Sequence, residues 1–447
     1  MHIVIIGNGI SGATAAKTLR KHSAHKITMV SYESDNFFSR TALMYVFMGH
    51  MRMKDLEPHP LSFWEGNNIY LLNNYVSSID FDGKRIEFID HSTLEYDKLI
   101  IATGSKTKKY GWPGQDLDGV HGLYHLQDLE ALERHSESME QAVIVGGGLI
   151  GVELAEMLHS RNIPIIFLVR ESQYWRNVLP EEEAQMVSDH IIDHGIDLRF
   201  ETELKEIWGD ESGKVKMIVT SKGEKIKCSY VGISTGVTPN ISFLDFSAIE
   251  TDKGILVDQY LNTSISDVYA VGDCAQLRKA NRDRKSIEAV WYTGRMMGQI
   301  AALNILGQKQ TAYNPGIWFN SAKFFDIEYQ TYGKIPEVSN KYFTHLFWRH
   351  PDKNKSIRIV YSKATKAVVG FNLMGIRYRH EVCERWIKNK VTIQEVLPQL
   401  SLANFDPEFY KEYEKEIIDI YNSESGETLQ KKSSRSLKKV FQFLLPS

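Results

Sequence analysis

Two glycine-rich segments of the same pattern, each directly after a short apolar run, constrain this chain more than any other feature. The first is Gly7-Asn8-Gly9-Ile10-Ser11-Gly12, and the second is Gly146-Gly147-Gly148-Leu149-Ile150-Gly151. A buried strand that turns on glycines into a helix lets backbone amides approach a pyrophosphate at the positive end of that helix. One such match is weak evidence. Two, each with its strand before and its helix after, predict two dinucleotide-binding sites in one chain.

Two dinucleotides on one chain have a usual chemical reason. One brings a hydride and the other, a flavin, receives it. The sequence therefore predicts FAD and NAD(P)H as cofactors.

Length and composition set the broad class of the protein. A chain of 447 residues is too long for one ordinary core, so two to four domains are expected. With 43% apolar and 24% charged residues, the composition is that of a folded globular protein. The net charge of −3 gives no overall positive potential that would attract nucleic acid. No apolar run reaches the ~20 residues of a spanning helix, and no signal peptide is evident, so a cytoplasmic location is expected. Three cysteines without a C-x-x-C pair predict no metal site.

The pattern of strands and turns predicts an α/β protein with a discontinuous first domain. Val268-Tyr269-Ala270-Val271-Gly272-Asp273 reads as a strand that needs a partner sheet, and we assign it to the first domain. From Tyr313 the pattern changes to short strands followed by helix, which predicts an α+β unit. The expected limits are 1–112 with 237–312 for the FAD-binding domain, 113–236 for the NAD(P)H-binding domain, 313–422 for the interface domain and 423–447 for a linker and tail.

The chain resembles the flavoproteins with two dinucleotide-binding domains, the pyridine nucleotide-disulfide oxidoreductase superfamily. The resemblance covers about residues 1–422 and rests on five ordered motifs. They are the two glycine segments, Ala102-Thr103-Gly104, Thr235-Gly236-Val237-Thr238-Pro239-Asn240 and Val268-Tyr269-Ala270-Val271-Gly272-Asp273. The resemblance implies two Rossmann-like βαβ domains in three layers, with FAD on the first and NAD(P)H on the inserted second, and a C-terminal domain that mediates dimerisation.

The resemblance also implies roles for residues of the first domain. Gly7, Gly9 and Gly12 would cradle the FAD pyrophosphate, Glu33 would bind the adenosine ribose and Asp273 the ribityl chain. Each role has a plainer alternative: Gly12 could serve only helix packing, Asp273 could cap a helix, and Asp35 could compete with Glu33. The same motifs supply further predicted cofactor-binding residues: Ile10, Ser11, Ala102, Thr103, Gly104, Gly146, Gly148, Leu149, Ile150, Gly151, Gly236 and Gly272.

The segment from Asn36 to Tyr45 contains no cysteine, which decides the branch of the superfamily. A thiol relay needs sulfur, so chemistry through a redox disulfide is excluded. The segment instead resembles that of the ferredoxin, rubredoxin and nitrite reductase flavoproteins, which implies that Arg40 pairs with the flavin pyrophosphate rather than serving as a surface charge. Tyr45 departs from the lysine that some of these reductases carry there. Trp291 is expected either beside the flavin ring or in the core.

Two arginines of the second domain bear on the choice of coenzyme. Arg170 stands 19 residues past Gly151, where an acid would bind the ribose of NADH, and Arg176 follows it. This pair resembles the NADPH-selecting arginines of glutathione reductases, and guanidinium groups suit a 2′-phosphate, so NADPH is favoured. Glu171 could instead offer an acid to NADH. Glu153 would lie near the nicotinamide or complement the helix dipole.

The C-terminal tail is basic and amphipathic. Residues 428–447 hold five basic residues and no acidic ones, and five apolar side chains (Leu437, Val440, Phe441, Leu444, Leu445) share one helical face. Such a helix could pack on its own chain, contact another subunit or lie on an anionic membrane surface.

These observations lead to one functional hypothesis with two alternatives. We expect an FAD-dependent NAD(P)H oxidoreductase that passes electrons to a carrier protein such as a ferredoxin or rubredoxin, with no catalytic side chain needed for the hydride step. A homodimer or a subunit of an electron-transfer complex is expected. The alternatives are a quinone reductase at the inner membrane face and a flavin-bearing, NAD(P)H-responsive subunit of a larger complex.

Overall fold

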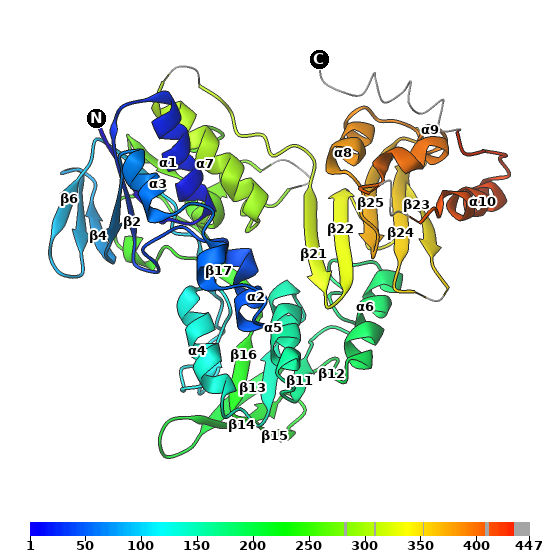
Figure 1. Ribbon diagram of the computed structural model, residues 1–447, viewed down its shortest axis with the longest axis horizontal. Coiled ribbons are helices and arrows are strands. Elements are labelled where there is room, and N and C mark those ends of the chain that lie inside the picture. The colour runs from blue at the N-terminus through cyan, green and yellow to red at the C-terminus, as the bar shows by residue number, and fades with distance from the viewer. Residues whose placement is uncertain (281–283, 308–309, 352, 407–410, 433–447) are drawn as a thin grey trace. The chain divides into compact units, whose positions relative to one another are not determined.

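The computed structural model describes residues 1–280, 284–307, 310–351, 353–406 and 411–432 (Figure 1). The chain forms two compact units. The first comprises Met1–Arg170 and Thr202–Pro315, and the second comprises Glu171–Glu201 and the chain from Gly316 onward.

A parallel sheet forms the core of the part of unit 1 that contains the N-terminus. Its strands lie in the order β19 (Val268–Ala270), β7 (Lys98–Ile101), β1 (His2–Ile6), β2 (Lys26–Ser31) and β3 (Ile69–Asn73). The side chains of Ile3, Val4 and Ile5 are fully buried, as expected for a strand covered on both faces. Because β19 pairs with β7 in register, a segment from far along the chain completes the sheet that the first strand begins.

Helices α1 (Ile10–His22) and α7 (Trp291–Ile305) lie side by side near this sheet (Figure 1). Their backbones approach closely, since a Cβ atom at Gly298 would lie 2.2 Å from the carbonyl oxygen of Ser11. The other elements around this sheet are α2 (Leu43–Phe47), α3 (Leu61–Gly66), β4 (Val76–Asp80), β5 (Arg85–Phe88), β6 (Thr93–Glu95), β8 (Ser105–Thr107), β17 (Val237–Pro239), β18 (Ile255–Val257), β20 (Ala275–Leu277) and the 3₁₀ helices η1 (Arg40–Ala42), η2 (Met53–Leu56), η3 (Ser242–Leu244) and η4 (Gly272–Cys274).

A second parallel sheet of unit 1 follows the second glycine segment. Strands β11 (Ile165–Leu168), β10 (Ala142–Val145), β16 (Tyr230–Ile233) and β9 (Val120–His121) lie in this order, and all are largely buried. Helices α4 (Leu126–Ser136) and α5 (Leu149–Ser160) pack on it, and β13 (Leu204–Gly209), β14 (Val215–Thr220) and β15 (Lys225–Lys227) form an antiparallel sheet. Two Rossmann-like βαβ arrangements therefore occur in one chain, as the sequence predicted.

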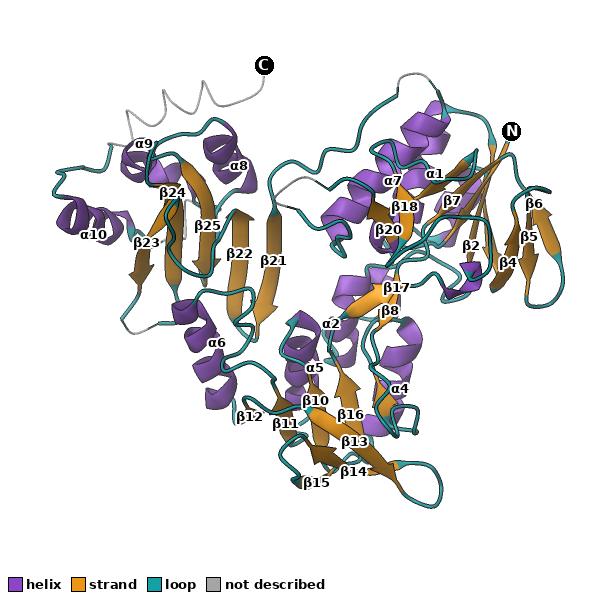
Figure 2. Cartoon of the chain, turned by 180° about the vertical axis from the view of Figure 1, so that it is seen from behind, coloured by secondary structure: helices purple, strands orange, loops and turns teal. Residues whose placement is uncertain are grey.

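Unit 2 is built on an antiparallel sheet (Figure 2). Its strand order is β21 (Phe319–Phe324), β22 (Ile327–Gly333), β25 (Val368–Met374), β24 (Ser356–Ser362) and β23 (Phe343–Arg349). The remaining elements of this unit are α6 (Glu181–Asp193), β12 (Asp197–Arg199), α8 (His380–Lys388), α9 (Ile393–Val396), the 3₁₀ helix η5 (Leu397–Ala403) and α10 (Glu414–Ser425).

A buried ion pair joins α6 to the sheet of unit 2. Arg358 on β24 donates through Nε to Glu183 Oε1 and through Nη2 to Glu183 Oε2, both at 2.8 Å. The side chains of Arg358 and Glu183 are 2% and 0% exposed. Residues 171–201, which the sequence analysis assigned to the span 113–236, thus form a compact unit with the C-terminal sheet.

The start of the C-terminal tail folds back onto unit 2. The backbone N–H of Lys432 donates to the carbonyl oxygen of Pro398 at 2.8 Å, and Lys431 pairs with Glu412 at 2.9 Å. The amphipathic face predicted for Leu437–Leu445 lies outside the described residues. Within the described part of the chain, no helix combines the length and the apolar character that crossing a membrane requires.

Candidate functional site

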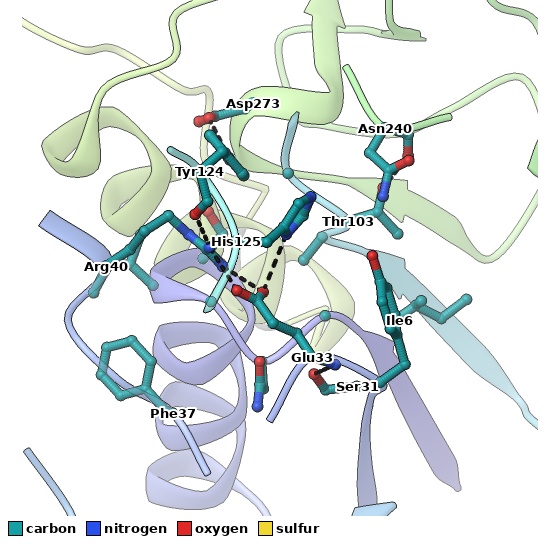
Figure 3. A pocket seen from close by; sticks show the side chains of 18 of the residues that line it. Ile6, Ser31, Glu33, Phe37, Arg40, Thr103, Tyr124, His125, Asn240 and Asp273 are labelled. Carbon is teal, nitrogen blue, oxygen red and sulfur yellow. Dashed lines mark hydrogen bonds and ion pairs between the residues drawn. The ribbon is translucent and has the colours of Figure 1, made fainter. Parts of the chain in front are cut away.

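A cavity opens at the carboxyl ends of β1, β2 and β7, the edge of a parallel sheet where ligands bind in such folds. Segments far apart in sequence meet there, including the end of β1, the loop before α4 with Tyr124 and His125, and Asp273 (Figure 3). The start of α7 also lines the cavity. Of the predicted site residues, the following line the cavity: Gly7, Gly9, Ile10, Ser11, Glu33, Arg40, Ala102, Thr103, Gly104, Asp273 and Trp291.

The first glycine segment is shaped to bring backbone close to a ligand. Gly7 has φ +111°, and a Cβ atom there would lie 2.2 Å from the carbonyl oxygen of Ala102. At Gly9, in contrast, an added Cβ would meet no atom within 4 Å, so this residue borders open space at the start of α1. No side chain caps that helix end. Free N–H groups at a helix start beside an open glycine fit a pyrophosphate.

Gly12 serves the fold rather than the cavity wall. A Cβ atom there would lie 2.0 Å from the carbonyl oxygen of Gly7, so only glycine lets α1 start this close to β1. Gly272 plays a similar part, since its added Cβ would lie 2.4 Å from Ser11 Oγ. Neither residue is among those that line the cavity.

The second glycine segment has the same three features: a glycine with positive φ at the turn, a glycine before the helix and a glycine where the helix approaches the strand. Gly146 has φ +112° and lies against Ser234, whose carbonyl oxygen would be 2.7 Å from an added Cβ. At Gly148, which precedes α5, an added Cβ would make only an ordinary contact with the carbonyl oxygen of Ser234 at 3.8 Å, no side chain caps that helix start, and Gly151 packs against Gly146. The geometry that fits a pyrophosphate therefore occurs twice.

Glu33 and Arg40 face each other inside the cavity (Figure 3). Arg40 donates to both carboxylate oxygens of Glu33, at 2.7 Å and 2.6 Å, and also to the carbonyl oxygen of Tyr124. The backbone N–H of Leu126 donates to Glu33 at 2.9 Å, and His125 Nδ1 lies 3.6 Å away. Burial by itself raises the pKa of Glu33, but His125 and Arg40 outweigh it and lower that pKa to about 2. Glu33 therefore stays ionised in the cavity.

Tyr124 links this ion pair to Asp273. Its hydroxyl donates to Asp273 Oδ2 at 3.0 Å, while the guanidinium of Arg40 lies 4.7 Å from the centre of its ring. Burial raises the pKa of Asp273, and it raises the pKa of Tyr124 strongly, so the phenol keeps its proton and remains a donor. A polar chain from Glu33 through Arg40 and Tyr124 to Asp273 thus runs across the cavity.

Several residues of this wall were not predicted from the sequence. Tyr124 and His125 lie in a loop directly before α4, where no motif marks them. The rings of Tyr32 and Tyr75 meet edge-on at 4.9 Å at the same cavity. Asn240 was seen only as the last residue of a motif, and its carbonyl oxygen accepts a hydrogen bond from Thr103 at 2.8 Å.

No thiol lines the cavity among the described residues. Cys228, Cys274 and Cys383 are all buried and free. Burial raises the pKa of all three thiols, that of Cys228 to about 12, so none is poised as a thiolate.

The predicted nicotinamide residues lie away from this cavity, at the second sheet. Leu149, Ile150 and Glu153 belong to the first turns of α5. Burial, together with the nearby Glu156, raises the pKa of Glu153 to about 7. Arg170 is exposed just beyond β11.

Two further predicted residues also lie outside the cavity wall. Arg176 donates to the carbonyl oxygen of Leu179 at 3.3 Å. Gly236 has φ +107° and precedes β17.

Comparison with known families settles the assignment of the chain. The profile of the pyridine nucleotide-disulphide oxidoreductase family matches residues 1–298, about two thirds of the sequence. The chain belongs to this family. Membership, the two-sheet fold and the glycine cradles together make the protein an FAD-dependent NAD(P)H oxidoreductase, as the sequence predicted.

Individual members of the family show similarity over much of the chain. Rhodocoxin reductase from Rhodococcus erythropolis is 31% identical over 62% of this chain and 65% of its own length. Rubredoxin-NAD(+) reductase from Pseudomonas putida is 28% identical over 73% of this chain and 86% of its own length. Among solved structures, a NAD-dependent persulfide reductase from A. fulgidus shares the fold, with a TM-score of 0.83, 24% identity and coverage of 95% of this chain and 84% of its own.

Proposed function

We propose that this oxidoreductase passes electrons from NAD(P)H, through FAD, to a small carrier protein of the ferredoxin or rubredoxin type. The observation that carries the proposal is a cofactor cavity with no thiol in its described wall. A reductase without a thiol relay must give its electrons directly to an acceptor. Similarity to reductases named for rubredoxin and rhodocoxin supports a protein acceptor.

The residues of the cavity bind and orient, and none of them is needed to move a proton. When bound, FAD would supply the redox chemistry, as the acceptor of a hydride from the nicotinamide and the source of two single electrons, with the proton of that hydride leaving to solvent. The amides at the start of α1 would hold the pyrophosphate together with Arg40. Glu33 would accept hydrogen bonds from the adenosine ribose, Asp273 would bind the ribityl chain, and Trp291 would border the flavin ring.

We also propose that Arg170 and Arg176 favour NADPH over NADH. Each supplies a guanidinium group of the kind that binds a 2′-phosphate. Arg170 is exposed directly after β11, the strand beside the second glycine cradle. The rival is Glu171, the residue next to Arg170, which would offer a carboxylate to the ribose hydroxyls of NADH.

Stopped-flow reduction of the purified holoprotein tests both proposals. NADH and NADPH are compared first, and the reduced protein is then mixed with a ferredoxin, a rubredoxin and a soluble quinone. Faster reoxidation by a carrier than by the quinone supports the carrier proposal, and the reverse order contradicts it. Slow reoxidation by every acceptor would favour the non-enzymatic alternative.

The coenzyme proposal has its own matched pair of variants. Arg170→Glu should lower the ratio of kcat/KM for NADPH over NADH at least ~10-fold, because a carboxylate repels the 2′-phosphate. Arg85→Glu, at an exposed position of β5, is the control and should leave this ratio unchanged. An unchanged ratio in Arg170→Glu would contradict the assignment.

A further inference from the structure

A histidine in the last turn of α6 and the histidine that directly follows this helix meet an aspartate of the β21–β22 turn within unit 2. His190 and His194 are one helical turn apart, and Asp326 lies between β21 and β22. His190 Nε2 is 2.5 Å from Asp326 Oδ1. One donor atom from each of the three side chains lies within 4.8 Å of the other two. Neither the proposed redox reaction nor the cofactor cavity involves these residues.

Each imidazole is held in place by a hydrogen bond at Nδ1. His190 Nδ1 pairs with the side-chain amide of Asn354 at 2.9 Å, and His194 Nδ1 lies 2.8 Å from the carbonyl oxygen of His190. The ring of Phe325 stacks on His194 with centroids 4.2 Å apart. A metal-binding histidine donates its second ring N–H to an acceptor and directs the other nitrogen at the ion. His194 Nδ1 faces such an acceptor, the carbonyl oxygen of His190, whereas His190 Nδ1 faces Nδ2 of Asn354, so metal binding requires the Asn354 amide to turn and present Oδ1 as the acceptor.

The environment adds one buried and one exposed ligand. The side chain of His190 is 8% exposed, whereas that of Asp326 is 81% exposed. Phe325, which has φ +57°, and Asp326 form the two-residue turn between β21 and β22. Asp326 therefore lies at the tip of this hairpin. An ion held here would therefore have protein on one side and water on the other.

We propose that His190, His194 and Asp326 bind a divalent transition-metal ion, best matched by Zn²⁺. Two imidazole nitrogens and one carboxylate suit zinc, whereas magnesium and calcium prefer oxygen ligands. Atoms bound to one zinc ion at about 2 Å lie roughly 3.3 Å apart. His190 Nε2 and Asp326 Oδ1 would therefore move apart by ~0.8 Å to admit the ion, and the other donor pairs, which lie within 4.8 Å, would close by at most ~1.5 Å. Water would complete the coordination from the exposed side.

The bound ion would crosslink the end of α6 to the turn between β21 and β22. The buried Glu183–Arg358 pair already fixes the first turn of the same helix to β24. His190 and His194 lie at its other end, so a metal ion there would fix both ends of the helix to one sheet. The site is thus structural, and its occupancy adds to the stability of unit 2.

A second histidine pair in unit 1 provides an internal comparison. Asp118, His121 and His135 also place three donor atoms within 4.8 Å, and His135 Nε2 is 3.0 Å from Asp118 Oδ1. Among the described residues, however, none forms a hydrogen bond with Nδ1 of either histidine. Without such outer partners the cluster should bind metal more weakly.

Calorimetric titration of the chelator-treated, full-length holoprotein with ZnCl₂ tests the proposal. The wild type should take up one zinc ion that Asp326→Asn and His194→Gln bind at least ~100-fold more weakly. Both substitutions are on accessible side chains of near-equal size, and circular dichroism checks their fold. Asp118→Asn is the matched control and should keep the wild-type zinc affinity.

A second variant tests the outer partner. Asn354→Ala should weaken zinc binding about 10- to 100-fold, as losses of outer hydrogen bonds to ligands do. Zinc should also raise the unfolding temperature of the wild type but not that of Asp326→Asn. A wild type that takes up no zinc, or an Asp326→Asn protein with unchanged zinc affinity, would overturn the proposal and leave His190 and Asp326 as an ordinary ion pair.

Discussion

The guanidinium of Arg40 and the carboxylate of Glu33 form a two-pronged ion pair inside the cofactor cavity, with N–O distances of 2.7 Å and 2.6 Å. The side chains are 27% and 9% exposed. The sequence analysis assigned these residues to separate parts of FAD, the pyrophosphate and the ribose. Because they form an ion pair, the positive charge of one compensates the negative charge of the other, and a change in either alters the charge that a bound cofactor would meet.

Removing the cation should therefore weaken FAD binding in two ways. Arg40→Ala loses a charge-assisted hydrogen bond to phosphate, worth about 1.5–3 kcal/mol, and leaves Glu33 as an unbalanced anion near the pyrophosphate. We expect the Kd for FAD to rise at least ~10-fold, measured by quenching of flavin fluorescence on the apoprotein. Arg52→Ala removes an exposed arginine from an ion pair with Asp55 and serves as the control. Equal FAD affinity in both variants would remove Arg40 from the site.

The buried pair of Glu183 and Arg358 leads to a prediction on stability. Glu183→Ala removes the partner that accepts two hydrogen bonds from Arg358, which is 2% exposed, and leaves it only the half-exposed Glu182, whose Oε2 accepts from Nη2 at 2.7 Å. Loss of one partner of such a pair costs about 3–5 kcal/mol. The double variant Glu183→Leu with Arg358→Met, which removes both charges, should be more stable than Glu183→Ala. Denaturant unfolding followed by circular dichroism provides the comparison. A Glu183→Ala protein as stable as the wild type would contradict the importance of this contact.

The sequence predicted the parts of the cavity that follow from strand-to-helix turns. Ala102 and Asp273 were assigned to one site although they lie far apart in the chain, and both line one cavity. Trp291, for which the core was an equal alternative, lines the same cavity. This succeeded because each follows or precedes a motif whose order is fixed. In contrast, Tyr124 and His125 lie in a loop with no repeating pattern, so only the folded chain brings them to Glu33.

The partner of α6 could not be read from the sequence either. The apolar face of a helix records that it packs on something, but not on which sheet. The contact that joins α6 to β24 depends on the polar residues Glu183 and Arg358, which are 175 positions apart. Residues such as these are more often exposed than buried, so their pairing leaves no signal in one sequence.

Thiol reagents should leave the enzyme intact. Because Cys228, Cys274 and Cys383 are buried and their pKa values are raised, we expect native protein to react with almost no iodoacetamide at pH 8. NAD(P)H-dependent dye reduction should change less than ~2-fold after treatment. Denatured protein, the control, should react at all three cysteines. Loss of activity together with modification of one thiol in the native protein would reopen a role for sulfur.

Glu153 gives the protein a pH-dependent stability of predictable sign. Its pKa is raised to about 7 because burial, reinforced by Glu156, disfavours the carboxylate. The folded state therefore holds this proton more tightly than the unfolded chain, whose glutamate titrates near 4.5. The contribution of this proton to stability is complete below pH 4.5 and is lost as the pH rises through 7.

Glu153→Gln, which cannot ionise, should unfold at a higher temperature than the wild type at pH 8, and this difference should shrink at pH 5. The corresponding difference in the free energy of unfolding is at most about 3 kcal/mol. Glu87→Gln on the exposed part of β5 controls for the general loss of one charge. If the wild type and Glu153→Gln lose stability in parallel between pH 5 and pH 8, the carboxyl group is already ionised at neutral pH and its pKa is not raised as expected here.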